Sequence, residues 1–109
     1  MALPLNVFKT VNYVAPLSAV GIYTAPTGYT GVILMAQAAN IDSAAHDVTF
    51  SHKRGGTTTE LVKSSPIPGN DALSLVSGRL VLESGDSIEL SASNASNVKV
   101  TVSILETLN

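Results

Sequence analysis

The side chains best suited to catalysis or metal binding are few and far apart in this 109-residue sequence. The two histidines, His46 and His52, lie six residues apart in a stretch with strand-like alternation. A strand would hold them on one face but about 20 Å apart, because it rises about 3.3 Å per residue. One metal ion cannot bridge that distance. We therefore expect both histidines near solvent, at the two ends of one strand.

Carboxylates that could pair as general acid and general base are confined to one region. Glu83 and Asp86 flank a turn, where an aspartate commonly accepts hydrogen bonds from the backbone. Glu89 falls on the polar side of the strand that follows. No serine lies in the Gly-x-Ser-x-Gly pattern of an activated nucleophile. The sequence thus predicts no catalytic residue, no metal ligand and no cofactor, and we expect that the protein is not an enzyme.

The charge content argues against nucleic acid as a partner. Charged residues make up 13% of the chain and the net charge is −2, whereas ordinary soluble domains have roughly 25% charged residues. Affinity for nucleic acid depends on neutralising many phosphates. Lys53-Arg54 is the only adjacent basic pair, and we expect it at a solvated hairpin tip.

Membrane insertion and secretion are also not indicated by the sequence. No apolar stretch approaches the roughly 18 residues of a membrane-spanning helix. The start, Met1-Ala2-Leu3-Pro4, lacks the basic region of a secretion signal. A carbohydrate site is disfavoured because the tyrosines are scattered and tryptophan is absent.

The polar surface must be built mainly from hydroxyl groups, since the chain contains 23 serine and threonine residues. Cysteine is absent, so stability has to come from sheet packing or from neighbouring chains. Two interpretations of this charge-poor composition stay open. The chain is a neutral soluble domain, or much of its surface is covered in an assembly.

Apolar side chains recur with a period of two, which is typical of strands with one buried face. The clearest series is Val98, Val100, Val102 and Ile104, and a second one runs from Ile88 to Ala92. The residues between them, 94–97, are turn-rich. We predict that these two strands pair as an antiparallel hairpin.

Similar patterns predict further strands upstream. The stretch 29–39 is long and nearly continuously apolar, as expected of a central strand covered on both faces. The pair Gly55-Gly56 predicts a tight turn, and the segment 65–70 is expected to be a loop because it holds two prolines. The other predicted strands are 18–24, 47–53, 57–63 and 78–82.

Seven or eight short strands without a convincing helix predict an all-β fold, an antiparallel two-sheet β-sandwich or jelly roll. We assign residues 18–109 to this sandwich. Residues 1–17 form a separate extended segment bracketed by Pro4 and Pro16. This segment is either an edge strand or an arm that pairs with another subunit by strand addition.

Two stretches resemble small virion structural proteins of tailed bacteriophages, especially those of marine and cyanobacterial phages. The first is residues 22–40, with Tyr-Thr-Ala-Pro-Thr-Gly before an apolar strand. The second is residues 78–88, with Leu-Val-Leu-Glu-Ser-Gly-Asp-Ser-Ile. The resemblance extends over about residues 18–108 and implies a β-sandwich that sits on a particle.

The resemblance further implies a capsid decoration (cement) protein that binds and stabilises the outer shell of the virion. Its partners would be the major capsid protein or other virion proteins and further copies of itself, with a trimer favoured. It would be assembled in the cytoplasm of the host bacterium, with neither nucleic acid nor membrane as a partner. The alternatives are a neck, collar or tail protein of the same fold, or a glycan- or surface-binding module.

Overall fold

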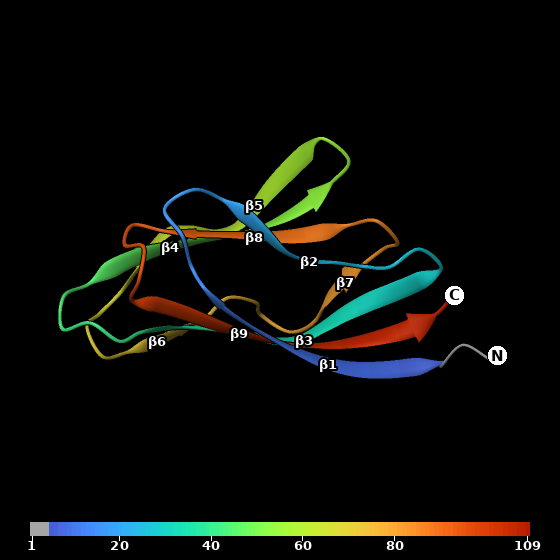
Figure 1. Ribbon diagram of the computed structural model, residues 1–109, viewed down its shortest axis with the longest axis horizontal. Helices are drawn as coiled ribbons and strands as arrows, with labels where there is room; N and C mark the ends of the chain where they lie inside the picture. Colours follow the sequence, from blue (N-terminus) through green and yellow to red (C-terminus); the bar gives the residue numbers. More distant parts are fainter. Residues whose placement is uncertain (1–4) are drawn as a thin grey trace.

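Two antiparallel sheets enclose one apolar core in the computed structural model, which describes residues 5–109 (Figure 1). Nine strands were found where seven or eight were expected, and the predicted two-sheet all-β fold is confirmed. The strands are β1 (Asn6–Val14), β2 (Val20–Thr24), β3 (Tyr29–Asn40), β4 (His46–Arg54), β5 (Thr57–Ile67), β6 (Ala72–Ser74), β7 (Leu80–Leu82), β8 (Ser87–Ala92) and β9 (Val98–Leu108).

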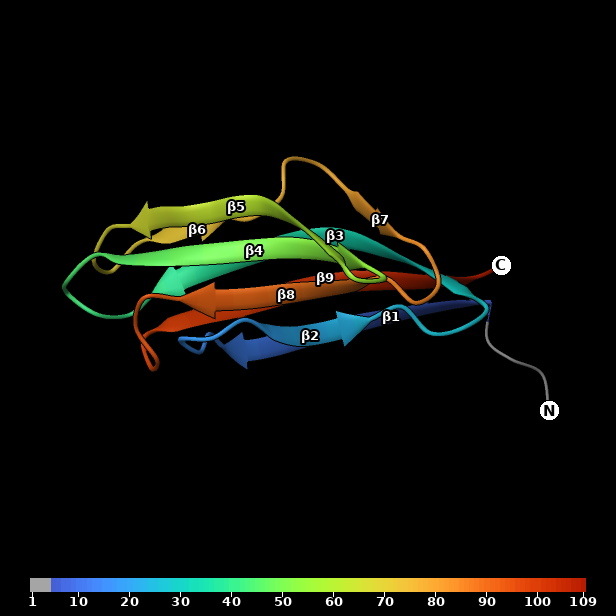
Figure 2. The same cartoon turned by 90° about the horizontal axis from the view of Figure 1, so that it is seen from above.

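The five-stranded sheet has the order β1-β9-β3-β6, and β7 pairs with another part of β3. The four-stranded sheet has the order β2-β8-β4-β5. Figure 2 shows the strands of the second sheet lying over those of the first, with β2 over β1 and β8 over β9. One side of the sandwich is therefore formed by β1 and β2, and the other by β5, β6 and β7.

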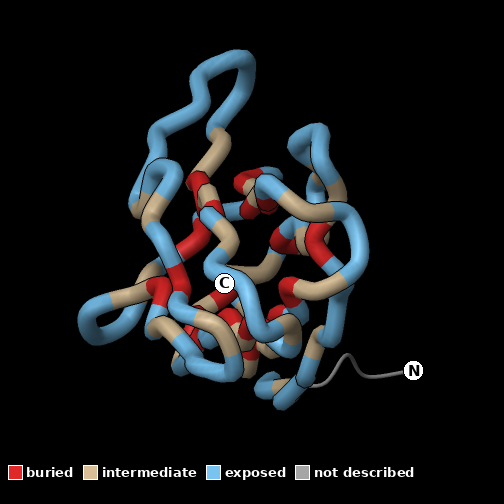
Figure 3. The backbone as a smooth tube through the Cα atoms, turned by 90° about the vertical axis from the view of Figure 1, so that its left-hand side faces the viewer, coloured by how far each residue is buried: buried red, intermediate tan, exposed pale blue. Residues whose placement is uncertain are grey.

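The core is aliphatic and contains one buried aromatic side chain, Phe50 on β4. Figure 3 shows the buried positions gathered toward the middle of the molecule, with exposed positions around them. Strand β9 contributes its alternate residues, as the period-two series predicted. The fully buried large apolar residues are Phe50, Ile33, Ile67, Leu82, Ile88, Leu90, Ile104, Val48, Val98, Val100 and Val102.

The predicted hairpin between the last two long strands is wrong. β8 lies in the four-stranded sheet and β9 in the five-stranded sheet, so the connection 93–97 passes from one layer to the other. The Asn94 side chain closes this turn by accepting hydrogen bonds from the backbone amides of Ser96 and Asn97 (2.9 and 3.1 Å). Two strands that each have one apolar face can pair side by side or stack face to face, and alternation alone does not distinguish the two arrangements.

Two predictions about individual strands are also wrong. β5 continues to Ile67, and Pro66 lies opposite Asp47 inside the segment expected to be a loop. The ladder accepts this proline because β5 is an edge strand. β3 is central in its sheet but is covered on one face only, since Met35 and Gln37 are exposed on the other.

The N-terminal segment pairs with the same chain over its whole described strand. β1 runs antiparallel to β9 from Asn6 opposite Thr107 to Val14 opposite Lys99, and it forms an edge of the five-stranded sheet. Residues 1–4, on which the secretion-signal argument rests, lie outside the described residues. A contact of this segment with another subunit stays a prediction. Within residues 5–109, no helix is long and apolar enough to cross a membrane.

The core predicts how two phenylalanines differ in their contribution to stability. Phe50→Ala should lower the free energy of unfolding by about 3–5 kcal/mol, because it leaves a cavity among well-packed side chains. The same change at Phe8, which is 74% exposed, should cost little. Urea denaturation of both variants measures the difference. Equal losses in the two variants would contradict this placement of the core.

Candidate interaction surface

The strongest polar cluster in the described part of the chain joins the β4–β5 hairpin to the turn before β8. Asp86 is 3% exposed. Its carboxylate accepts hydrogen bonds from Arg54 Nε (2.9 Å), Arg54 Nη2 (2.7 Å) and the Glu83 amide (2.9 Å). His52 Nε2 lies 3.1 Å from the same carboxylate. Asp86 therefore caps its own turn, as predicted, and it also ties β4 to that turn.

The sequence-predicted polar residues are not brought together into one site. His46 lies next to Asp42 (Nε2 to Oδ2, 2.8 Å) and His52 next to Asp86. Glu89 pairs with Lys53 on the outside of the four-stranded sheet (3.6 Å). Arg54 is exposed at the hairpin tip, as expected, and it also donates to Asp86. Within residues 5–109, no group of three or more histidine or acidic side chains is placed to hold a metal ion.

Hydrogen bonds lower the pKa of two aspartates. The pKa of Asp86 is held well below its usual range by the Arg54 guanidinium, with smaller contributions from His52 and the Glu83 amide that together outweigh the effect of burial. The pKa of Asp42 is lowered by the hydrogen bond with His46 and by the Ser43 amide. Both carboxylates thus stay ionised in moderately acidic solution.

A second buried polar group was missed by the sequence analysis. The Tyr23 hydroxyl donates to Glu106 Oε2 (2.5 Å), and Lys9 Nζ lies 3.3 Å from Glu106 Oε1. These residues come from β2, β9 and β1, so the group joins the two sheets at one side of the sandwich. Gly31 lies opposite Glu106 and leaves room for the tyrosine ring, since a Cβ there would be 3.2 Å from it.

Burial and the hydrogen bond to Glu106 raise the pKa of Tyr23 well above its usual range. The position of Glu106 was available in the sequence, because it continues the inward series of Val98 to Ile104 by one further step. The partner was not available, since Tyr23 is 83 residues away.

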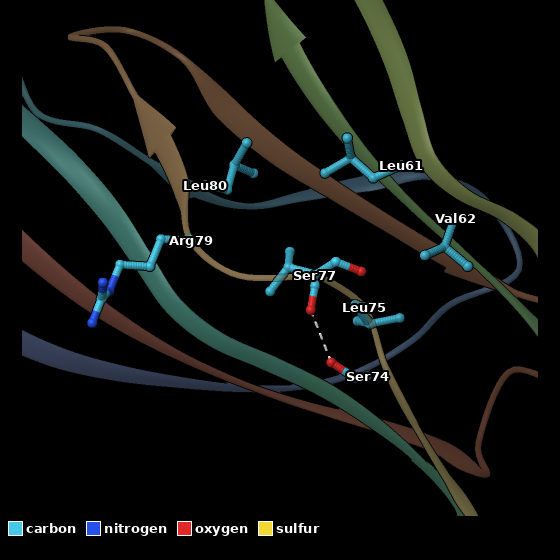
Figure 4. A pocket seen from close by; sticks show the side chains of 8 residues that line it. Leu61, Val62, Ser74, Leu75, Ser77, Arg79 and Leu80 are labelled. Carbon is cyan, nitrogen blue, oxygen red and sulfur yellow. Dashed lines mark hydrogen bonds between the residues drawn. The ribbon is translucent and has the colours of Figure 1, made fainter.

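A shallow hollow of about 320 Å³ opens on the side of the sandwich away from β1 (Figure 4). Aliphatic side chains of β5 and of the segment from β6 to β7 line it, and the Arg79 guanidinium points away from the other labelled side chains. Ligand pockets usually combine an apolar lining with a few converging polar groups. This lining contains neither an aromatic ring nor a carboxylate, so it does not have the composition of a carbohydrate site.

The outer surface of the five-stranded sheet carries few charged side chains. Register places a row of apolar side chains across four neighbouring strands, and we call it the apolar row: Phe8 on β1, Leu105 on β9, Val32 on β3 and Val81 on β7. Phe8 and Val81 are 74% and 54% exposed. Among the outward positions that the register aligns on this sheet, one is charged, Lys99.

The outer surface of the four-stranded sheet has the opposite character. Ser51 lies between Glu60 and Glu89 on its two neighbouring strands, and Lys53 pairs with Glu89 on the same surface. One broad face of the sandwich therefore carries charges suited to water. The other presents hydroxyl groups and an apolar row suited to contact with protein.

The fold and this surface define the chain as an antiparallel β-sandwich with one charge-poor face. No protein-family model matches the sequence, and no curated protein matches it. Eleven chains of solved structures match its fold. One is from the acidic stable capsid structure of Helicobacter pylori bacteriophage KHP30. It has 10% identity and a TM-score of 0.59, and the match covers 96% of this chain and 89% of that one.

Another similar chain is from the Bacillus endospore appendages, described as a novel family of disulfide-linked pili. It has 16% identity and a TM-score of 0.55, and the match covers 95% of this chain and 88% of that one. At these identities the likeness shows a shared fold. The sequence resemblance to virion proteins of marine and cyanobacterial phages stays a prediction.

The Asp86 cluster predicts an acid-sensitive contribution to stability. Asp86→Asn should melt several degrees below the wild type at neutral pH, because it removes the charge that Arg54 faces. A lowered folded-state pKa stabilises the fold above the unfolded-state value of about 3.9 and loses that effect as the pH falls further. The difference should therefore shrink below about pH 4. Thermal melts across pH measure it, with Glu60→Gln as the exposed control. A constant difference would contradict the assignment.

The tyrosine group predicts the reverse dependence on pH. Tyr23→Phe should lower the free energy of unfolding by about 1 kcal/mol at pH 7, because Glu106 loses a donor. A raised phenol pKa stabilises the fold fully below the unfolded-state value of about 10, and this effect is lost progressively as the pH rises from that value to the folded-state value. Urea denaturation at pH 7 and at about pH 11 should show the gap narrowing. If the difference in the free energy of unfolding between the wild type and Tyr23→Phe widened with pH, the assigned contact between Tyr23 and Glu106 would be wrong.

Proposed function

We propose that this chain is a structural subunit of a bacteriophage virion and that it acts as a capsid decoration protein on the outer shell. The observation that carries the proposal is the contrast between the two broad faces. A charge-poor face crossed by an apolar row suits burial against other proteins, whereas the opposite face suits water. The proposal assigns no catalytic activity to the chain.

The sequence of β3 supports the same proposal. Residues 32–36 are apolar without interruption, as in a strand covered on both faces. In the single chain the outer face of β3 is open, and Met35 is 38% exposed. A partner on this face would give β3 the environment that its sequence suits.

The predicted sequence resemblance and the likeness of fold also favour an assembly role. The resemblance of residues 22–40 and 78–88 to phage virion proteins is independent of the coordinates. The structures with a similar fold include a chain from a phage capsid and one from a pilus. In the proposed role the partners are the major capsid protein or other virion proteins together with further copies of this chain, and the location is the virion.

The second candidate is a neck, collar or tail protein, which the same sandwich and the same charge-poor face would also suit. The two roles differ in copy number rather than in fold. A shell-covering protein occurs in hundreds of copies, whereas a component of a neck or tail ring follows the cyclic symmetry of that ring.

Counting this chain per particle by quantitative mass spectrometry of purified virions tests the proposal. We expect hundreds of copies. About six or twelve copies would replace decoration by the neck or tail role, and absence from the particle would overturn both.

The same measurement tests the charge-poor face with a matched pair of variants. Val81→Lys places a charge in the apolar row, and we expect it to lower the number of copies on the particle several-fold. Thr58→Lys adds the same charge to the exposed outer surface of the four-stranded sheet. We expect this variant to be present in the same number of copies per particle as the wild type. Both variants should melt like the wild type. Equal occupancy of the two variants would contradict the role of this face.

A further inference from the structure

The edges of the two sheets are protected to very different degrees. β2 has five residues and a register shift after Gly21, and β5 has two register shifts and Pro66. The far edge of the five-stranded sheet is divided between β6 and β7, which have three residues each. Shortness, bulges and prolines are common ways of preventing an edge from pairing with another chain.

β1 has none of these protections. Its nine residues follow an unbroken register with β9 and include neither proline nor glycine. Its single charged residue, Lys9, turns its ammonium group to the buried Glu106 of the same chain. Among the described strands, only β9 pairs with β1. Its other side is a long and regular edge.

The backbone groups at this free edge can be assigned from the bonds at the two ends of the strand. The Ala15 amide donates to the Val98 carbonyl, and the Leu5 carbonyl accepts from the Leu108 amide (both 2.8 Å). In an antiparallel ladder, alternate residues bond to the same neighbour. The odd-numbered residues of β1 therefore bond to β9. The amides and carbonyls of the even-numbered residues point outward, and these are Asn6, Phe8, Thr10, Asn12 and Val14.

Exposed apolar side chains gather along the same segment. Five of the nine large hydrophobic residues exposed in residues 5–109 lie between positions 5 and 17. They are Leu5 (69%), Phe8 (74%), Tyr13 (40%), Val14 (44%) and Leu17 (64%). The free edge therefore combines unpaired backbone groups with apolar surface.

We infer that β1 pairs antiparallel with β1 of a second copy of this chain, about a two-fold axis at Thr10. Even residues then face even residues: Thr10 faces Thr10, Phe8 faces Asn12 and Asn6 faces Val14 of the second copy. All five outward-pointing residues are used, and hydrogen-bonded pairs of this kind exchange two bonds each, so about ten backbone bonds form. The five-stranded sheets of the two copies join into one sheet.

Side-chain chemistry supports a second copy as the occupant. The register places Val7 opposite Tyr13 of the second copy and Thr10 opposite Thr10, and aromatic–β-branched and Thr–Thr pairs both stabilise antiparallel sheets. Lys9 is the one charge on the strand and faces Val11 of the second copy. Because Glu106 lies beside Lys9 in its own chain, the two copies meet without an uncompensated like charge.

The size of the contact determines how strong the pairing is. Nine residues span about 30 Å at about 3.4 Å per residue. A single pair of strands of that length buries less than the roughly 800 Å² per partner of a stable complex. Pairing in dilute solution is therefore weak. It becomes effective where many copies are held side by side, as in the proposed decoration role.

A disulfide test on the purified full chain measures this pairing without a particle, so it can fail independently of the proposed function. The chain has no cysteine, so one introduced thiol can link only two copies. Opposite residues of a hydrogen-bonded pair have Cα atoms about 5.5 Å apart, within disulfide range. Thr10→Cys should therefore dimerise at least about tenfold faster than Asn12→Cys. In the latter variant the two thiols lie four residues apart along the paired strands.

Equal rates for the two variants, or faster linkage of Asn12→Cys, would overturn the two-fold register. Hydrogen exchange of the wild-type chain provides a second measurement that needs no substitution. On concentration from micromolar to millimolar, the amides of Phe8, Thr10 and Asn12 should exchange more slowly, while those of Val7 and Val11 should not change. No change at the even positions, or protection shared with β5 or β6, would overturn self-pairing of β1.

Discussion

Burial of the two inner sheet faces against each other is the interaction on which the rest of the structure depends. The chain has no disulfide and one buried aromatic side chain, so the aliphatic residues of β3, β4, β8 and β9 supply most of the apolar burial. The polar contacts with Asp86 and Glu106 lie at the margins of the sheets. Those of Asp86 with Arg54 and His52 depend on the pairing of β4 with β8 inside the four-stranded sheet, whereas the contact of Tyr23 with Glu106 forms only when the two sheets are stacked.

Period-two alternation was sufficient to predict the fold class and the positions of most strands, because each strand exposes one face to the core. The same alternation did not determine which strands are neighbours in a sheet. β8 and β9 have the same pattern whether they lie side by side or face to face, and the five-residue connection allows both arrangements. The short strand β6 was missed because its three residues contain one large apolar side chain, Leu73, whereas the equally short β7 shows alternation through Leu80 and Leu82. Pro66 led to the prediction of a loop, because proline has no amide hydrogen to donate. An edge strand tolerates it, since such a strand has a hydrogen-bonded neighbour on one side only.

The polar contacts also fall into two kinds, those that a local sequence pattern predicts and those that depend on how the strands are arranged. The role of Asp86 at its turn follows from residues three positions apart, and the sequence analysis predicted it. Its bonds to Arg54 and His52 depend on the pairing of β4 with β8, which no local pattern specifies. Glu106 occupies an inward position in the alternation of β9 and could have been flagged as a buried charge. Its partner Tyr23 could not have been found, because the contact joins the two sheets.

The charge-poor face and the β1 edge adjoin one another. Two copies paired through β1 would therefore direct their charge-poor faces to the same side. Phe8 belongs to both, since its side chain begins the apolar row while its backbone groups point outward at the free edge. Pairing of two β1 strands would place two apolar rows in one continuous sheet and so double the area offered to a shell. The charged face of the four-stranded sheet would then be directed to solvent on both copies. Lateral pairing and attachment would thus use different parts of β1, the backbone edge for one and the outward side chains for the other.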